Sequence, residues 1–413
     1  MRSTKPRTGI VLSGGGARGA YEAGLVAGII EVLQPTPAKP PFQIFAGTSV
    51  GAINASFLAA NAQRQNLAAD ELCDIWRGLN LRAHLQLDLT VFLGFHAGLT
   101  KLARRVPFLR GRLDDYLRPS LLDPRPLEGV VRDHIPWGAL RANLRSGIVD
   151  SLVVAALEVR TGRTTMFVDL APGADFRPSK DPRRQVRRTT IEAHHILASA
   201  AIPVAFPARR IGDEYYSDGG LRFNTPISPA IRSGADRLVV VSLIQEPIAR
   251  MKLLDGGESE IDQELYANPL FLAGKILNAL LLDPIGYDLQ VLERFNKLLK
   301  VLDDTLDPAE RKRLEAVMRD SRGVPYRILE TLSFAPSEDI GRLAFEHLRQ
   351  HLPRLQVEGL VAWMLGQASS GSATWEADLA SYFLFDGAFA GRLIELGRHD
   401  AHAREAEIRA FFA

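Results

Sequence analysis

The segment from Gly47 to Gly51 (GTSVG) sets a serine between two glycines, with the G-x-S-x-G spacing of a nucleophile elbow. An apolar run at 42–46 precedes the segment and small residues at 52–60 follow it, so we predict a strand, a sharp turn and a helix. Because the glycines remove side chains that would clash, Ser49 on such a turn projects its hydroxyl into a cleft. The segment therefore predicts a serine nucleophile but does not identify the base that activates it.

A second glycine-rich segment, residues 14–19 (GGGARG), lies between a short apolar run at 9–12 and a helical pattern at 20–33. Such a loop can cradle a phosphate in a dinucleotide-binding fold or supply backbone N–H groups to an oxyanion hole. A dinucleotide site needs an acidic residue about 20 residues further on. Residues 35–41 contain no acid, which disfavours that site. A glycine turn that serves only helix–sheet packing stays open as a third alternative.

A third segment is Asp218-Gly219-Gly220, which follows a predicted strand at 214–217. An aspartate before glycine is by itself an ordinary turn signal. A carboxylate with a pKa near 4 is a poor base in water, but it becomes a better base where the site is dry. The two glycines allow a tight turn that could aim the carboxylate at a serine hydroxyl.

In this order, GGGARG at 14–19, GTSVG at 47–51 and DGG at 218–220 resemble the patatin-like phospholipase family. The segment ASAAIPVAFP at 198–207 is similar to the family as well, and so are Asn224 and Pro226. The resemblance covers about residues 8–245. It implies an α/β fold with a patatin-like three-layer core around a central, mostly parallel sheet. Two C-terminal stretches are similar to the tail of bacterial members, at 382–386 and 393–397.

The resemblance also implies a Ser–Asp dyad, with Ser49 as nucleophile and Asp218 as general base. It implies no cofactor and no metal ion. The implied activity is hydrolysis of lipid acyl esters, of the phospholipase A or lysophospholipase type. The oxyanion hole would be formed by Gly14, Gly15 and Gly16, with Arg18 in support. The remaining motif positions are Gly19, Gly47, Gly51, Gly219 and Gly220.

A histidine is the usual alternative base, and in an α/β-hydrolase it follows the acid in the chain. His194 and His195 precede Asp218, so they do not fit that order. The later histidines lie in charged helical patterns that favour solvated surfaces. Two of these, His347 and His351, have the i, i+4 spacing of metal ligands, but no third ligand accompanies them.

Composition agrees with a globular enzyme of 413 residues, 46% of them hydrophobic. The net charge of +2 is too small to indicate a nucleic acid partner. The single cysteine, Cys73, fits a reducing compartment, and we expect a cytoplasmic protein without a signal peptide or transmembrane helix. Two stretches, 85–112 and 268–282, are candidates for peripheral membrane contact, although buried core helices are favoured for both.

The pattern divides the chain into a catalytic α/β core at 8–245 and a helical extension at 250–413. We predict strands at 152–159, 164–168, 209–211, 214–217 and 237–244, and a polar loop at 172–188. From about residue 250 onward the pattern changes to helices, at 288–303, 308–319, 338–351, 356–367 and around 375–396. The alternative to an enzyme is a non-catalytic lipid-binding or interaction module on the same fold.

Overall fold

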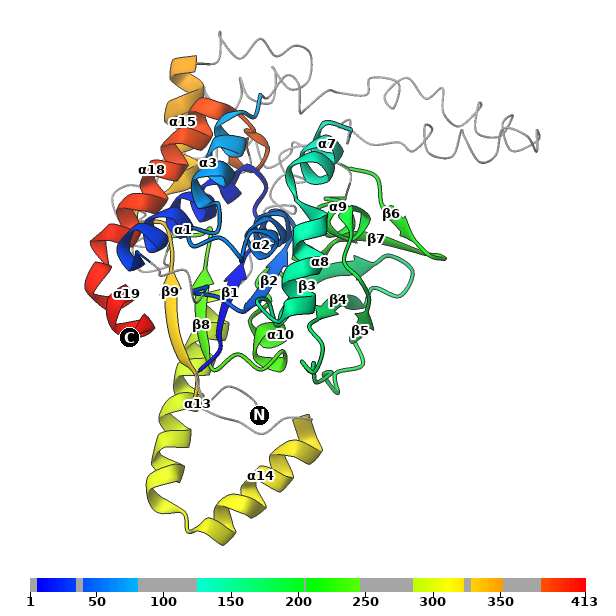
Figure 1. The fold of residues 1–413 in the computed structure, drawn as a ribbon, viewed down its shortest axis with the longest axis vertical. Helices are drawn as coiled ribbons and strands as arrows, with labels where there is room; N and C mark the ends of the chain where they lie inside the picture. Colours follow the sequence, from blue (N-terminus) through cyan, green and yellow to red (C-terminus); the bar gives the residue numbers. More distant parts are fainter. Residues whose placement is uncertain are drawn as a thin grey trace, which may run out of the picture.

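The computed structural model describes residues 6–34, 40–80, 125–203, 206–245, 285–322, 328–351 and 380–413. These residues form a nine-stranded sheet between helices (Figure 1). The main path has the order β5-β4-β3-β2-β1-β8-β9, and β7 pairs with both β3 and β6. The strands are β1 (Thr8–Leu12), β2 (Ile44–Thr48), β3 (Ser151–Glu158), β4 (Thr164–Leu170), β5 (Arg184–Arg188), β6 (Arg209–Ile211), β7 (Glu214–Asp218), β8 (Arg237–Val241) and β9 (Glu330–Phe334).

Most strand pairs are parallel. β1 pairs in parallel with β2 and β8, and the parallel pairs β2–β3 and β8–β9 extend the sheet on each side. The antiparallel pairs are β3–β4, β3–β7 and β6–β7. The predicted mostly parallel α/β sheet is therefore confirmed.

Both faces of the sheet are buried, and alternate residues of each central strand enter different cores. On β1, Ile10 and Leu12 join one cluster while Val11 joins the other. The first cluster includes residues of α1 and α2, and the second includes residues of α10. Burial on both faces explains the nearly continuous apolar runs that predicted these strands. The helices of this part are α1 (Gly19–Leu33), α2 (Val50–Ala60), α3 (Ala69–Arg77), α7 (Arg125–His134), α8 (Trp137–Ser146), α9 (Ala193–Ser199) and α10 (Ile227–Arg232).

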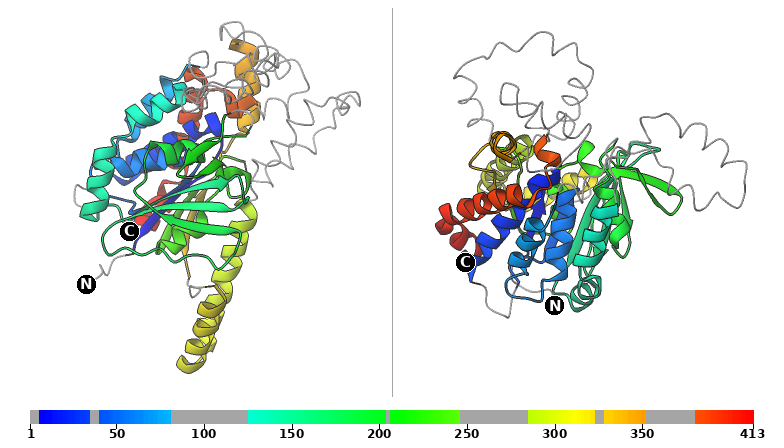
Figure 2. Two further views of the ribbon diagram at one scale, coloured as in Figure 1. Left: turned by 90° about the vertical axis from the view of Figure 1, so that its right-hand side faces the viewer. Right: turned by 90° about the horizontal axis from the view of Figure 1, so that it is seen from above.

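The C-terminal portion is mainly helical, as predicted, but it also contributes a strand to the sheet. β9 pairs in parallel with β8, an addition that the sequence pattern did not predict. The figures show α13 and α14 extending away from the sheet (Figures 1 and 2). The helices are α13 (Ile285–Thr305), α14 (Pro308–Arg322), α15 (Ile340–His351), α18 (Gly387–Ala403) and α19 (Glu405–Phe412).

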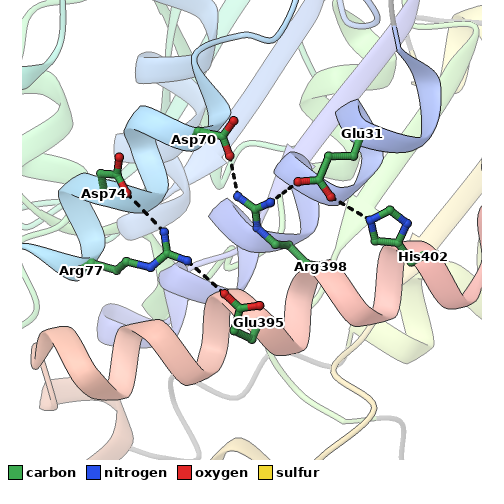
Figure 3. A network of polar contacts seen from close by, with 7 residues as sticks. All are labelled: Glu31, Asp70, Asp74, Arg77, Glu395, Arg398 and His402. Atoms are coloured by element: carbon green, nitrogen blue, oxygen red, sulfur yellow. Dashed lines mark hydrogen bonds and ion pairs between the residues drawn. The ribbon is translucent and has the colours of Figure 1, made fainter.

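Helix α18 packs along α1, and ion pairs reinforce this contact (Figure 3). Arg398 on α18 pairs with Glu31 on α1 and with Asp70 on α3. The His402 Nε2 atom lies 2.7 Å from a carboxylate oxygen of the same Glu31. A residue of the C-terminal portion thus bridges two helices of the predicted core, so the two portions share one packed structure.

One segment of the predicted loop at 172–188 is instead a strand. Residues 184–188 form β5, which pairs in parallel with β4 at one edge of the sheet. The three arginines of this segment hide it from a pattern search, yet charged side chains are typical of edge strands because they oppose edge-to-edge association. The guanidinium of Arg184 lies 4.5 Å from the ring centroid of Phe223, so β5 also makes a cation–π contact with the residues that follow β7.

Three predicted segments lie outside the described residues: 85–112, 268–282 and 356–367. Among the helices that the structure describes, none combines the length and the apolar character needed to span a bilayer.

Candidate functional site

Ser49 lies at the junction of β2 and α2, with the backbone dihedrals φ 55° and ψ −126°. A positive φ is strained for a non-glycine residue, and such strain is typical of functional sites. The elbow packs too closely for side chains at its glycines. A Cβ on Gly47 would lie 2.2 Å from Gly51 O, and a Cβ on Gly51 would lie 2.4 Å from Leu12 O. The elbow is therefore pressed against the end of β1, and only glycine fits at both positions.

Sheet register brings Asp218 to the same place. Thr48 at the end of β2 pairs with Ala155 on β3, and the next β3 residue, Ala156, pairs with Asp218 at the end of β7. The Asp218 N–H donates to Ala201 O at 2.8 Å, which fixes the start of the following turn. Strand pairing thus places the predicted serine and aspartate side by side although 169 positions separate them in the chain.

The Asp218 carboxylate is fully buried. Its Oδ1 accepts a hydrogen bond of 2.7 Å from Gly220 N, while its Oδ2 has no partner of normal hydrogen-bond geometry among the described residues. The Ser49 hydroxyl is still close enough to lower the pKa of Asp218. We therefore interpret the Ser49–Asp218 contact as longer or less well aligned than a standard hydrogen bond, as is common before substrate binds.

Burial dominates the electrostatics of Asp218. Removal from water raises its pKa to about 7, and the interactions with Ser49 and Gly220 only partly offset this effect. A carboxyl group with a pKa near 7 is a much stronger base than an ordinary aspartate. Asp218 could thus accept a proton near neutral pH.

The glycine loop lies directly against the serine. A Cβ on Gly14 would lie 3.1 Å from Ser49 Cβ. The Gly14 N–H donates to Asn224 O at 3.2 Å, and Asn224 Nδ2 donates to Gly14 O at 3.0 Å. The Gly14 N–H is thus engaged in this reciprocal pair, whereas those of Gly15 and Gly16 have no acceptor in the described part of the chain. The latter two are the better placed donors of this loop.

Arg18 fixes the loop from behind. Its side chain is 2% exposed, and its Nε donates to Ser381 Oγ at 2.7 Å. Its guanidinium carbon lies 4.1 Å from the ring centroid of Tyr382. Tyr382 also packs on Gly16, because a Cβ at Gly16 would lie 2.1 Å from Tyr382 O. Residues beyond 380 thus hold the glycine loop in place.

An apolar pocket opens at Ser49. Gly16 and Ser49 line it, and most of its remaining surface is aliphatic or aromatic. The Trp76 ring stacks parallel to that of Phe385, with centroids 6.4 Å apart. The other lining side chains include Ile53, Leu127, Ile202 and Phe206. This surface suits a hydrocarbon chain next to the hydroxyl.

Two polar residues at the site were missed by the sequence analysis. Ser199 Oγ accepts a 2.8 Å hydrogen bond from Ser49 N and donates a 2.6 Å bond to Ala155 O, so it ties the elbow to β3. Glu22 is fully buried in α1. Ser199 lies in the segment already noted at 198–207, but Glu22 carries no motif signal, because a single acid in a helix resembles a surface residue.

The histidines do not approach Ser49 or Asp218 through any interaction within the described residues. His195 belongs to the capping box of α9, where Glu192 N donates to its Nδ1 at 3.1 Å. Burial lowers its pKa to about 4. His347 is buried against Asp386, with 3.0 Å between Nε2 and Oδ1, and is not the surface residue that was predicted. In the described part of the chain, no three metal-ligating side chains come together.

Comparison with known proteins identifies the family of this chain. The family model described as patatin-like phospholipase matches residues 10–231. Among solved structures, VipD from Legionella pneumophila is 14% identical with a TM-score of 0.29, and 94% of this chain and 92% of VipD are covered. Human GIVD cytosolic phospholipase A2 is 13% identical with a TM-score of 0.40, and 98% of this chain and 60% of the human chain are covered. Its complex with methyl gamma-linolenyl fluorophosphonate is 14% identical with a TM-score of 0.42, and 98% of this chain and 59% of the human chain are covered. No curated protein matches the sequence.

Proposed function

Since the chain belongs to the patatin-like phospholipase family, we propose that it hydrolyses acyl esters of lipids with Ser49 as nucleophile and Asp218 as base. Family membership supports the lipid acyl hydrolase activity, and the dyad is our proposal. The observation that carries it is a strained serine facing a buried carboxylate, with an apolar pocket at the hydroxyl. The substrate class is a phospholipid, a lysophospholipid or a related lipid ester.

In the proposed reaction, Asp218 takes the Ser49 proton as Oγ attacks the ester carbonyl carbon. The carbonyl π electrons move to oxygen and form a tetrahedral oxyanion. When this intermediate collapses, the bond to the alcohol oxygen breaks and Asp218 returns the proton to the leaving alcohol. Water then attacks the acyl-enzyme with Asp218 again as base, which releases the fatty acid and restores the Ser49 hydroxyl.

The oxyanion needs donors already in place. We propose the N–H groups of Gly15 and Gly16, which have no acceptor in the described part of the chain, while Gly14 holds the loop through Asn224. The positive end of the α2 dipole also points toward Ser49. Loss of one oxyanion donor typically costs about 3–4 kcal/mol of barrier, so the geometry of this loop should strongly influence kcat.

The direct test compares Ser49→Ala with Ser56→Ala on the same helix. Ser56 is also buried, and its hydroxyl has no partner among the described residues, so its removal leaves no polar group unpaired. We expect Ser49→Ala to abolish both ester hydrolysis and labelling by a fluorophosphonate probe, whereas Ser56→Ala retains both. Normal hydrolysis by folded Ser49→Ala would refute the nucleophile assignment.

The same probe separates an enzyme from a non-catalytic lipid-binding module. A binding module on this fold would hold lipid in the pocket without covalent labelling of the wild-type protein. Labelling that maps to Ser49 by peptide mass spectrometry supports the enzyme. Lipid binding without labelling or turnover would favour the module.

A further inference from the structure

Glu22 is a buried acid that the proposed reaction does not use. Its side chain has no exposed surface, and no basic side chain of the described residues forms an ion pair with it. Burial raises its pKa to about 8, although hydrogen bonds from Asn54 and Ser13 lower it. An unpaired buried carboxyl group is costly, and an apolar residue would fill the space without that cost. The position therefore calls for an explanation other than packing.

The two carboxylate oxygens of Glu22 bind opposite sides of the site. Oε1 accepts a 2.8 Å hydrogen bond from the N–H of Ser13, the residue directly before the glycine loop. Oε2 accepts a 2.9 Å bond from Nδ2 of Asn54, on the second turn of the helix that Ser49 begins. Glu22 thus connects the loop that carries the proposed oxyanion donors to the helix that carries the nucleophile.

The orientation of Asn54 is determined by two further partners. Its Nδ2 also donates to Gly19 O at 3.0 Å, and its Oδ1 accepts from Trp76 Nε1 at 3.1 Å. A flipped amide would set an N–H group against the Trp76 N–H group and an oxygen against a carbonyl oxygen. Asn54 therefore presents a donor to Glu22, and the two oxygens of the Glu22 carboxyl group accept from this donor and from the Ser13 N–H.

We propose that Glu22 is a positioning residue for ester hydrolysis, holding the glycine loop at a fixed position relative to Ser49 through Ser13 and Asn54. The same amide holds Trp76 in the wall of the apolar pocket. This role rests on the proposed function. A displacement of about 1 Å within a catalytic constellation can cost on the order of a hundredfold in rate, so loss of the bridge should affect kcat more than KM.

The informative substitution is Glu22→Gln. The amide keeps the shape and an acceptor for Ser13, but it sets its own NH₂ group against the NH₂ group of Asn54. We expect kcat for a short-chain ester to fall about 10- to 100-fold, while KM changes less than about threefold. The double variant Glu22→Gln with Asn54→Asp restores a donor–acceptor pair between the two residues and leaves an acceptor for Trp76. It should recover part of the lost kcat, because the donor–acceptor pair with residue 22 is restored while the hydrogen bond to Gly19 O is replaced by a contact between two oxygens.

A matched control separates positioning from a general loss of stability. Tyr21 precedes Glu22 on the same helix, is equally buried, and donates a 2.9 Å hydrogen bond to Asp400 on α18, away from Ser49. Tyr21→Phe should lower the melting temperature and keep kcat near the wild-type value.

Four outcomes decide the proposal. A folded Glu22→Gln variant with kcat within twofold of wild type would overturn the positioning role alone. An equal loss of kcat in Tyr21→Phe at a matched loss of stability would do the same. If Glu22→Gln does not fold, the double variant decides: a folded but inactive double variant overturns the role, and an active one supports it. A wild-type protein that neither hydrolyses esters nor reacts with the fluorophosphonate probe would overturn the proposed function, and the role of Glu22 with it.

Discussion

The pH dependence of hydrolysis is the sharpest test of Asp218 as the base. Only the ionised carboxylate can accept the Ser49 proton. The rate of the step that forms the acyl-enzyme should therefore follow the ionised fraction of Asp218 in the free enzyme. The perturbation is a change of pH from 5 to 8 with a substrate that does not itself titrate in this range.

The magnitude follows from burial. With the pKa raised to about 7, roughly 1% of Asp218 is ionised at pH 5 and roughly 90% at pH 8. We therefore expect kcat/KM to increase on the order of 50- to 100-fold across this range, with half of the maximum near pH 7. An aspartate with its ordinary pKa of 3.8 is already about 94% ionised at pH 5 and would give an almost flat profile.

The assay is initial-rate hydrolysis of a neutral 4-nitrophenyl ester, followed at the isosbestic wavelength of nitrophenol so that detection does not depend on pH. The Ser49→Ala protein supplies the background rate at each pH. The rate of labelling by a fluorophosphonate probe should have the same profile, because labelling uses the same attack by Ser49.

Glu22, with its pKa raised to about 8, is the other buried acid that could shape this profile. The residual activity of Glu22→Gln should therefore retain the rise centred near pH 7. A flat wild-type profile between pH 5 and pH 8 would refute the dependence on a buried Asp218. A rise that disappears in Glu22→Gln would assign the titration to Glu22 instead.

Further predictions concern stability and the elbow. Because the pKa of Asp218 is raised in the folded state, its contribution to stability is fully present below pH 3.8 and is lost as the pH increases through about 7. The Asp218→Asn variant should therefore melt at a higher temperature than wild type at pH 8 in calorimetry. An unchanged melting temperature would contradict this. Gly16→Ala should lower the free energy of unfolding by at least about 1–3 kcal/mol in urea titrations, because φ is +57° and Tyr382 O lies where the methyl group would be. Ser199→Ala should lower the free energy of unfolding by about 1–3 kcal/mol, because it leaves the Ser49 N–H without its hydrogen-bond acceptor. It should also slow labelling by the fluorophosphonate probe, and an unchanged labelling rate would show that the elbow holds its shape without this bond.

The sequence predicted the central strands and the proposed dyad for different reasons. Parallel strands buried on both faces appear in the sequence as apolar runs, so the strand Arg237–Val241 could be recognised before its neighbouring strands were known. Ser49 and Asp218 were recognisable because glycines are required beside them, and these glycines leave a short local motif. Burial of the strands and close packing at the turns both depend on residues that are adjacent in the chain, so both leave a local signal in the sequence.

The missed features depend on contacts between distant segments. β9 joins the sheet by pairing with β8, almost 90 positions earlier, and nothing in Glu330–Phe334 specifies that partner. Glu22 looks like a solvated helix residue until α2 and the Ser13 backbone enclose it. The engagement of the Gly14 N–H by Asn224 likewise becomes visible only in three dimensions.

The contact of Arg18 with Ser381 and Tyr382 has a consequence for biosynthesis. During translation at about 5–20 residues per second, roughly 20–70 s separate the addition of Arg18 from that of Tyr382. From residue 49 onward the nascent chain contains Ser49, and from residue 218 onward Asp218 as well, but until Ser381 and Tyr382 are added the glycine loop lacks the residues that hold it. The proposed active site is thus completed by residues made more than 360 positions after the glycine loop, so a translation product truncated before Ser381 would carry the proposed dyad without the residues that hold this loop.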